Sequence, residues 1–371
     1  MKTHDQRWAS LVVIGAGGNI GSHLVTHLAR LPGVRRILLV DQDYYSESNL
    51  GSQDIRRRDV GRPKATVQAR RLREIDARIT VEAVLASVET VALGKLRCDV
   101  MLACVDSRAA RRAISALAWR LGVPWIDAGV NGPELLARMN VYTPGPEQPC
   151  YECAMDDGDY ATLEQAYPCL GGESSVAPTN APSALGALAA ALQALECRKL
   201  LAGAREEVAV GKQVTVCART HRELVTAFRP NPRCRFDHEI WRIERVALRS
   251  DQCTVAQALA LGRQTLATDD VVGLKVVDQV FARKLTCLAC GEQREFMPYL
   301  FGRLGRTART CERCGGTMRV AGFDVVEWLR AADLPASVCD ASLHSLGVRA
   351  GDVLSLAAGD RTMHVELGAH G

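Results

Sequence analysis

The sequence predicts an α/β fold in which helices cover both faces of a mostly parallel sheet, followed by a small C-terminal module. Three observations lead to this prediction. Short apolar strands alternate with amphipathic helices from residue 11 to residue 143, a glycine-rich turn follows the first strand, and two CxxC pairs lie close together near the C-terminus. The 371 residues are enough for one large and one smaller domain, which we place at residues 1–245 and 246–371.

The alternating segments of the first domain are short. Strands are expected at residues 11–14, 36–40, 80–84, 99–104 and 124–128, and the helices between them at residues 23–31, 65–75 and 108–121. Because the strands are almost continuously apolar, they are expected to be buried on both faces, as in a parallel sheet. A Cys-rich passage at 144–182 precedes an apolar helix that ends near Leu201, and the segments "EVAVGKQVTVCAR" and "RELVTAFRP" predict an antiparallel extension.

Composition excludes several classes of protein. The chain is 47% hydrophobic and 24% charged, as in an ordinary globular protein, and its formal net charge of +4 gives no reason to expect nucleic acid or a membrane surface as a partner. The longest apolar stretch, residues 184–195, is too short to span a bilayer, and the N-terminus has no run of signal-peptide length. We therefore expect a cytoplasmic protein, in which the 14 cysteines are metal ligands or reactive thiols rather than disulfides.

The segment "VVIGAGGNIGSHL" at residues 12–24 predicts a nucleotide-binding turn of the Rossmann type. Its glycines allow a tight bend, close approach of the backbone to phosphate, and close packing of helix on strand; they are Gly15, Gly17, Gly18 and Gly21. Asp41 ends the second strand, where a carboxylate accepts hydrogen bonds from ribose hydroxyls. Redox cofactors and ATP share this arrangement, so the turn by itself leaves both open.

The residues that follow Asp41 favour ATP. Asp43, Asn49 and Lys64 come next, and Lys64 is one of only seven lysines in a chain rich in arginine. A lysine is a compact charge that can follow a transferred phosphoryl group, whereas a dehydrogenase has no use for such a cluster. Asp106 follows the fourth strand, at the edge of the sheet where a carboxylate can hold Mg²⁺ on phosphates; a role as helix cap fits the same position.

The order of these motifs resembles the ThiF/MoeB/HesA adenylyltransferases, the prokaryotic relatives of ubiquitin-activating enzymes. The resemblance covers roughly residues 8–245 and rests on the glycine turn, "SNL" with a following glutamine, "GRPKA", "CVDS", "CYEC" and "LQALECRKLLAG". It implies that ATP and Mg²⁺ bind on the sheet of a homodimeric enzyme. The C-terminal glycine of a ubiquitin-like or sulfur-carrier protein then attacks the α-phosphate, which gives an acyl adenylate and pyrophosphate. By the same resemblance Asp41 binds the ribose with Asp43 beside it, Asn49 and Lys64 bind the phosphates, and Asp106 binds the metal.

The sequence departs from the family pattern at two places. In the family an arginine directly precedes the glutamine that follows "SNL", but Ser52 stands there in this chain. Among the arginines a few residues later, we favour Arg57 as the replacement cation. The N-terminal helix that donates an arginine across the dimer in many relatives is missing or very short here, which leaves Arg7 as the candidate.

Two groups of metal-ligating residues predict zinc sites. The pair in "CYEC" and the residues four apart in "NPRCRFDH" give a Cys₃His set that can be tetrahedral: Cys150, Cys153, Cys234 and His238. "CLAC" and "CERC" have the C-x2-C-x20-C-x2-C spacing of a zinc ribbon, at about residues 280–320: Cys287, Cys290, Cys311 and Cys314. In a competing arrangement the CYEC pair shares an ion with the CLAC pair. A β-rich tail with Gly-Asp turns follows the ribbon.

Cys169 is the expected reactive thiol. It lies in the loop "YPCLGGESS", where relatives carry an acyl-accepting or sulfur-transferring cysteine when they have one. A thiolate there takes the adenylated glycine as a thioester, for delivery to a downstream conjugating or sulfur-transfer protein. A non-catalytic loop cysteine is the alternative, because several relatives stop at the adenylate. The remaining cysteines are expected to be packing residues: Cys98, Cys104, Cys197, Cys217, Cys253 and Cys339.

The sequence thus predicts an ATP-dependent activating enzyme, with three alternatives left open. One is an NAD(P)-dependent oxidoreductase. The second is an enzyme that adenylates a peptide precursor in natural-product biosynthesis, with the ribbon module as its leader-binding part. The third, suggested by Ser52, is a weakly active protein that binds a ubiquitin-like partner without turnover.

Overall fold

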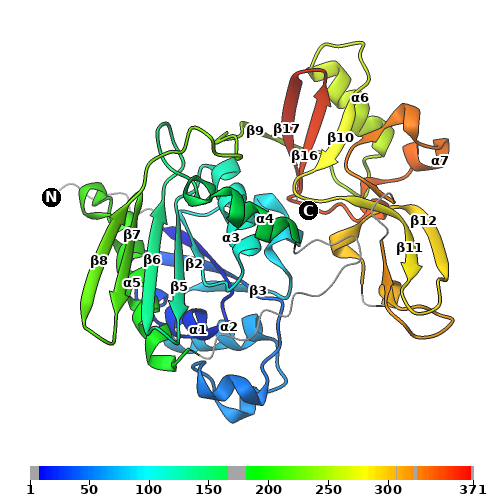
Figure 1. Cartoon of the computed structure of the whole chain (residues 1–371). Helices are drawn as coiled ribbons and strands as arrows, with labels where there is room; N and C mark the ends of the chain where they lie inside the picture. The colour runs from blue at the N-terminus through cyan, green and yellow to red at the C-terminus, as the bar shows by residue number, and fades with distance from the viewer. Residues whose placement is uncertain (1–7, 166–180, 306, 321–323, 369–371) are drawn as a thin grey trace. The chain divides into compact units, whose positions relative to one another are not determined.

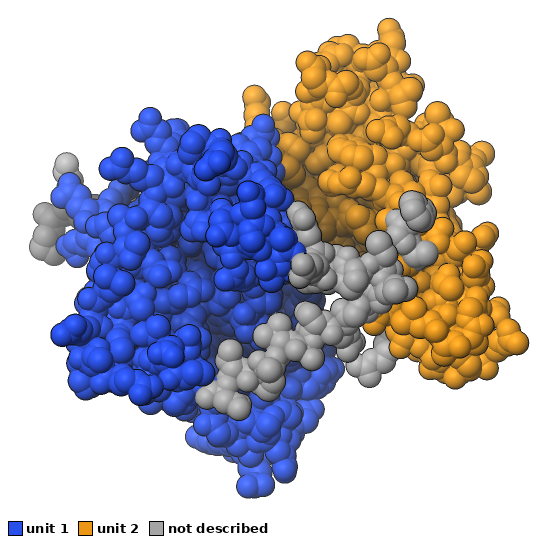
Figure 2. Space-filling model, viewed as in Figure 1, with its two compact units in different colours: residues 1–88, 96–163, 175–240 blue, residues 89–95, 164–174, 241–371 orange. Residues whose placement is uncertain are grey.

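The computed structural model describes residues 8–165, 181–305, 307–320 and 324–368. The chain forms two compact units (Figures 1 and 2). The first contains residues 1–88, 96–163 and 175–240, and the second contains residues 89–95, 164–174 and 241–371.

The first unit is built on an eight-stranded sheet with the order β3-β2-β1-β4-β5-β6-β7-β8. The strands are β1 (Ala9–Ile14), β2 (Val34–Val40), β3 (Thr80–Val84), β4 (Val100–Ala103), β5 (Trp125–Asn131), β6 (Leu136–Tyr142), β7 (Lys212–Cys217) and β8 (Arg222–Ala227). The pairs from β3 to β5 are parallel and those from β5 to β8 are antiparallel. The predicted α/β fold with a mostly parallel sheet is therefore confirmed.

Helices cover both faces of this sheet (Figure 1). The helices α1 (Asn19–Leu28), α2 (Lys64–Ile75) and α5 (Ser183–Leu201) share one buried core with strand side chains such as Leu39 and Leu102. Strand side chains alternate between faces, so Trp125 and Asp127 point to the opposite face, where α3 (Arg108–Leu121) packs. A short α4 (Asp157–Gln165) follows the CYEC segment. Among the described residues, no helix is both long enough and apolar enough to cross a membrane.

The first helix begins earlier than its sequence pattern predicts. The apolar spacing favours residues 23–31, but α1 runs over Asn19–Leu28, directly after the glycine turn. Its N-cap is Gly18, in an extended conformation with ψ of −175°. The early start brings Ile20 into the helix, where it is buried one turn before Leu24 on the same face.

The second unit contains two small sheets. One has the order β15-β10-β16-β17-β9, and the other joins β12 to β11, with β13 and β14 both pairing with β11. The strands are β9 (Ile243–Val246), β10 (Gly273–Val276), β11 (Phe281–Cys287), β12 (Gln293–Leu300), β13 (Met318–Arg319), β14 (Val325–Val326), β15 (Leu329–Arg330), β16 (Val353–Ala358) and β17 (Arg361–Leu367). The helices α6 (Val255–Thr265) and α7 (Ala336–Cys339) complete the core around Leu274, Phe281 and Leu356.

Residues 89–95, which lie between β3 and β4 in sequence, belong to the second unit. The Nε of Arg303 donates to the Thr90 carbonyl at 3.2 Å, and the Gly94 N–H donates to the Gly351 carbonyl at 2.8 Å. Arg303 also forms a fully buried ion pair with Asp352, with 2.7 Å between Nη2 and Oδ1. One guanidinium therefore joins this segment to the start of β16.

Candidate functional site

The glycine turn lies at the carboxyl end of β1, and at Gly15, Gly17 and Gly21 it has no room for a side chain. Gly15 has a φ of +74°, and a Cβ on it would lie 2.6 Å from the Cys104 carbonyl oxygen at the end of β4. A Cβ on Gly17 would lie 2.3 Å from the Cβ of Lys64. Gly18 gives α1 no side-chain cap, and the first turn of α1 has no acidic residue. The first N–H groups of α1 and its positive dipole end are therefore suited to an anion such as phosphate.

Asp41 holds this turn in place. Its Oδ2 accepts a hydrogen bond from the Gly17 N–H at 2.8 Å, and its Oδ1 accepts one from the Asp43 N–H at 3.0 Å. Burial raises the pKa of the Asp41 carboxyl above its ordinary value, and the two backbone hydrogen bonds partly oppose this shift. Because each carboxylate oxygen has further acceptor capacity, the same side chain can also accept hydrogen bonds from a ligand hydroxyl.

Lys64 is the buried cation of the site. It is the first residue of α2, its Nζ lies 3.1 Å from Asp43 Oδ2, and its backbone N–H donates to the Asp43 carbonyl at 2.9 Å. The lysine is only 8% exposed, whereas a lysine is almost never fully buried unless it is paired. The glycine turn, Asp41, Asp43 and Lys64 thus form one contiguous group, as the sequence order predicts.

Two residues of this group escaped the sequence analysis. Tyr45 donates its hydroxyl to the Gly17 carbonyl at 3.1 Å, and Gln68 on α2 donates to the Tyr45 hydroxyl at 2.7 Å. Both side chains are buried. A tyrosine beside a second tyrosine in "DQDYYS" gives no sequence signal of this role, because the contact depends on how the chain turns back from β2 to α2.

The other predicted phosphate and metal ligands lie outside that group. Among the described residues, no hydrogen bond or ion pair joins Asn49, Arg57 or Asp106 to Lys64. Asn49 accepts from the Ser46 N–H at 2.9 Å within its own turn. The Arg57 side chain is 83% exposed, and its Nη1 lies 3.8 Å from Glu47 Oε1. Both residues are therefore on short 3₁₀ turns at the surface.

Asp106 is exposed between β4 and α3, and it is not the cap of that helix. Ser107 is the N-cap, because its Oγ accepts the Ala110 N–H at 3.1 Å. The carbonyls of Val105 and Asp106 both accept hydrogen bonds from the guanidinium of Arg111, the latter at 3.3 Å. The Asp106 carboxylate therefore stays available at the carboxyl end of the parallel strands.

Arg111 is itself held by a buried carboxylate that the sequence did not reveal. Its Nε donates to both oxygens of Asp127 on β5, at 2.9 and 3.1 Å, and Arg138 Nη1 donates to Asp127 Oδ2 at 2.9 Å. Arg138 also donates to Asn140 Oδ1 at 2.8 Å. The Asp127 side chain is completely buried. This network fixes the backbone that carries Asp106.

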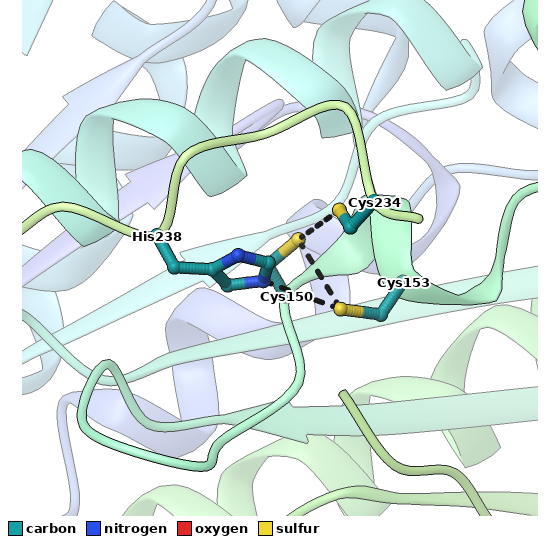
Figure 3. Close-up of side chains that lie close together, drawn as sticks. All are labelled: Cys150, Cys153, Cys234 and His238. Carbon is teal, nitrogen blue, oxygen red and sulfur yellow. Dashed lines mark hydrogen bonds between the residues drawn. The ribbon is translucent and has the colours of Figure 1, made fainter. Parts of the chain in front are cut away.

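The four residues of the predicted Cys₃His set come together in the first unit (Figure 3). Cys150 Sγ lies 3.8 Å from Cys153 Sγ and 3.6 Å from Cys234 Sγ, and Cys153 Sγ lies 3.2 Å from His238 Nε2. All four ligand atoms lie within 4.8 Å of one another. Sulfur atoms about 3.8 Å apart fit a tetrahedron with metal–sulfur bonds of about 2.3 Å. A hydrogen bond from Cys150 lowers the pKa of Cys153 to about 4, and His238 adds to this effect.

The surroundings of this cluster connect it to α3 and α4. The Trp119 ring of α3 packs edge-on against His238, with 4.9 Å between ring centroids. Glu152, which lies between the two cysteines of CYEC, accepts a hydrogen bond from the Tyr160 hydroxyl of α4 at 3.0 Å. The guanidinium of Arg235, next to Cys234, lies 4.0 Å from the centre of the Tyr160 ring. The two loops that carry these cysteines therefore both contact α4.

The second group of cysteines comes together in the second unit. The Sγ of Cys314 lies 3.5 Å from that of Cys287 and 3.4 Å from that of Cys290, and Cys290 Sγ lies 3.7 Å from Cys311 Sγ. The four ligand atoms again lie within 4.8 Å of one another. Each cluster can hold a metal ion by itself. The competing arrangement, in which the CYEC and CLAC pairs share one ion, is therefore wrong.

Two predicted residues, Cys169 and Arg7, lie outside the described residues. Three of the other cysteines, Cys104, Cys197 and Cys253, are buried. Burial raises the pKa of each, to about 12 in Cys197. Such thiols are poor nucleophiles, which agrees with packing roles.

Comparisons with known proteins agree with these features. The ThiF family model matches residues 4–236. The sulfur carrier protein ThiS adenylyltransferase of Escherichia coli is 31% identical over 53% of this chain and 73% of its own length, and ubiquitin-like modifier-activating enzyme 5 of Arabidopsis thaliana is 28% identical over 39% of this chain and 37% of its own. The crystal structure of E. coli MccB with ATP covers 61% of this chain and 65% of that chain, with a TM-score of 0.51 and 24% identity, and shows the same fold. The expected resemblance is thereby confirmed: the chain belongs to the ThiF family.

Proposed function

We propose that this protein uses ATP and Mg²⁺ to adenylate the C-terminal glycine of a ubiquitin-like or sulfur-carrier protein. The observation that supports this most directly is the buried Lys64, in van der Waals contact with the glycine turn and paired with Asp43. A fixed ammonium beside a phosphate-binding turn suits charge that develops on phosphoryl oxygens. Members of the ThiF family are adenylyltransferases, and family membership favours ATP over a nicotinamide cofactor.

In the proposed reaction, ATP phosphates bind the N–H groups of the turn and the start of α1, and the ribose binds Asp41. A carboxylate oxygen of the partner's C-terminal glycine attacks the α-phosphorus. The new bond joins that oxygen to phosphorus, the bond from the α-phosphorus to the bridging oxygen breaks, and pyrophosphate leaves with the electron pair. Lys64 neutralises charge on the phosphoryl oxygens, and Asn49 donates its amide to them.

Asp106 is the residue that we propose to hold Mg²⁺, and Asp43, which is paired with Lys64, is a second carboxylate at the nucleotide site. The donor set fits, because exposed carboxylate oxygens are ligands that Mg²⁺ prefers, and Asp106 is not used as a helix cap. When bound, the ion withdraws charge from the phosphate oxygens. Arg111 positions the Asp106 backbone for this purpose.

The remaining assignments follow the family resemblance. Arg57 would supply the positive charge of the family arginine that Ser52 replaces. Its ion pair with Glu47 is exposed and therefore weak, so Arg57 can leave it to bind phosphate. Arg7 would act across a homodimer. Both clusters would hold structural Zn²⁺, which suits cysteine and histidine ligands. Cys169 would accept the activated glycine as a thioester, with AMP as the leaving group, before transfer to a downstream protein.

ATP–pyrophosphate exchange tests this proposal. We expect exchange that depends on a ubiquitin-like protein ending in Gly-Gly and that is absent with the same protein lacking those two residues. Lys64→Met should reduce exchange by about 100-fold or more, whereas Lys212→Met, at an exposed lysine of β7, should not. Exchange with a short peptide instead would favour the peptide-modifying alternative. Binding of the partner with no exchange would favour the inactive binding protein, and the proposal would then be wrong.

A further inference from the structure

The second unit contains a cavity of about 410 Å³ that the proposed reaction does not use. Side chains of β11, β14, β15 and the short segments beside them form its wall: Arg283, Val325, Glu327, Trp328, Arg330 and Asp333. The volume is in the range of ligand-binding clefts, and an apolar and aromatic surface with a few charged groups is typical of such sites.

Arg283 has a hydrogen-bond donor without an acceptor. Its Nε is buried, and among the described residues it has no hydrogen-bond partner. The backbone N–H of Arg283 donates to the Asp324 carbonyl at 3.1 Å, so the chain at this point is fixed. Buried donors are nearly always satisfied, so an acceptor on a ligand in the adjacent cavity would complete the hydrogen bonding of this guanidinium.

The charges around the cavity favour an anionic acceptor. Glu327 forms an ion pair with Lys275, whose ammonium lies 5.7 Å from the centre of the Trp328 ring. Among the described residues, neither Arg283 nor Arg330 has a carboxylate partner. Lys275 neutralises Glu327, so the described wall has two arginines, Arg283 and Arg330, and one further carboxylate, Asp333. A carboxylate on the ligand would balance the remaining positive charge. Arginine binds carboxylates with two parallel hydrogen bonds.

The backbone at the same place has open strand edges. β14 pairs only with β11, and β15 pairs only with β10 at the end of its sheet, as far as the described residues show. Each of these two strands thus has one side on which no described strand pairs with it, both contribute residues to the cavity wall, and Val325 is 37% exposed. An extended peptide adds to such an edge through main-chain hydrogen bonds, and its side chains enter the neighbouring pocket.

From these observations together, we propose that this cavity binds an extended segment of another polypeptide that carries an acidic side chain next to an apolar one. The carboxylate binds Arg283 and Arg330, the apolar side chain packs on Val325 and Trp328, and the peptide backbone pairs with the open side of β14. The site takes a class of ligand distinct from ATP, and its occupation does not depend on the adenylation reaction.

A direct binding measurement on the whole 371-residue chain, prepared with Zn²⁺, tests the proposal. The probe is a fluorescent eight-residue peptide, blocked at both ends, in which Glu alternates with Val, and the matched peptide has Gln in place of Glu. We expect the Glu peptide to bind at least about tenfold more tightly than the Gln peptide, because charge-assisted hydrogen bonds are about twice as strong as neutral ones. Added salt should weaken the binding of the Glu peptide. Equal affinity for the two peptides would overturn the proposal.

Variants and a local signal locate the binding. Arg283→Gln and Arg330→Gln should each weaken the Glu peptide by about tenfold, while Arg263→Gln, at an exposed arginine of α6, should not. With 5-fluorotryptophan in the protein, the resonance that Trp328→Phe removes should shift on peptide addition, and that of Trp241 should not. Parent-like binding by folded Arg283→Gln and Arg330→Gln proteins, or an unchanged Trp328 resonance, would show that the peptide binds elsewhere.

Discussion

Replacement of Arg111 by Met should destabilise the first unit strongly. Asp127 is completely buried, and the substitution removes two of the three ionic hydrogen bonds that it accepts. Loss of one partner of a buried ion pair costs about 3–5 kcal/mol, and because Arg138 stays in place we expect the lower end, about 3 kcal/mol. For a unit of this size that corresponds to a fall in Tm of about 6–12 °C.

The assay is chemical and thermal unfolding of the full chain, with the two units followed as separate transitions. Only the transition of the first unit should move. Arg108→Gln is the control on the same helix, since the Arg108–Asp159 pair is exposed and should contribute less than about 1 kcal/mol. The double variant Arg111→Met with Asp127→Asn should recover part of the loss, because it removes the uncompensated charge.

A loss below about 1 kcal/mol in Arg111→Met would refute this reasoning, since it would mean that water or Arg138 fully compensates Asp127. The same variant should require more Mg²⁺ for half-maximal exchange, because Arg111 also fixes the carbonyls of Val105 and Asp106. A parent-like Mg²⁺ requirement together with lower stability would assign Arg111 a purely structural role.

Three further predictions follow from other contacts. Removal of the proposed Zn²⁺ from the Cys150 cluster with a chelator should speed hydrogen exchange in α4, because the cysteine-bearing loops contact that helix through Glu152 and Arg235, whereas α1 should keep its protection. Arg303→Met should destabilise the second unit by about 3–5 kcal/mol in denaturant unfolding, since it leaves the buried Asp352 unpaired; a loss below about 1 kcal/mol would contradict this. Burial raises the pKa of Asp41, so the folded protein takes up this proton at a higher pH than the unfolded chain does. The free energy of unfolding of the parent relative to Asp41→Asn should therefore increase as the pH falls towards 3.8, and denaturant unfolding of both proteins across that range measures this difference.

The sequence predicted the elements whose signals are local. Uniformly apolar strands, the glycine turn and the spacing of CxxC pairs each report a structure formed within a few residues, and the sheet and both cysteine clusters agree with them. The two halves of the Cys₃His set are far apart in the sequence, but each half, "CYEC" and "NPRCRFDH", has a recognisable ligand spacing.

The contacts that sequence reasoning missed join residues with no common pattern. Asp127 contacts Arg111 because β5 lies next to β4 in the sheet. The segment "PWIDAGV" gives no sequence signal that its aspartate pairs with a buried arginine. Tyr45 reaches Gly17 only through the return of the chain from β2 to α2. Residues 89–95 show no change of composition that would assign them to the second unit. Such pairings depend on the tertiary arrangement and leave no periodic trace.

The structure separates the candidate site into two parts, and this leads to a last prediction. The glycine turn contacts both Asp41 and Lys64 directly, so these groups are preorganised for the ATP binding that we propose. Arg57, in contrast, lies on an exposed turn, and we expect it to contribute only when charge develops in the transition state. Arg57→Ala should therefore reduce exchange by about tenfold or more and leave the Kd for ATP nearly unchanged, whereas Arg58→Ala, at the neighbouring exposed arginine, should change neither. If Arg57→Ala retains full exchange, a group other than Arg57 takes the role of the family arginine in whose place Ser52 stands. If instead it weakens ATP binding and exchange equally, Arg57 belongs to the preorganised part, and the division proposed here is wrong.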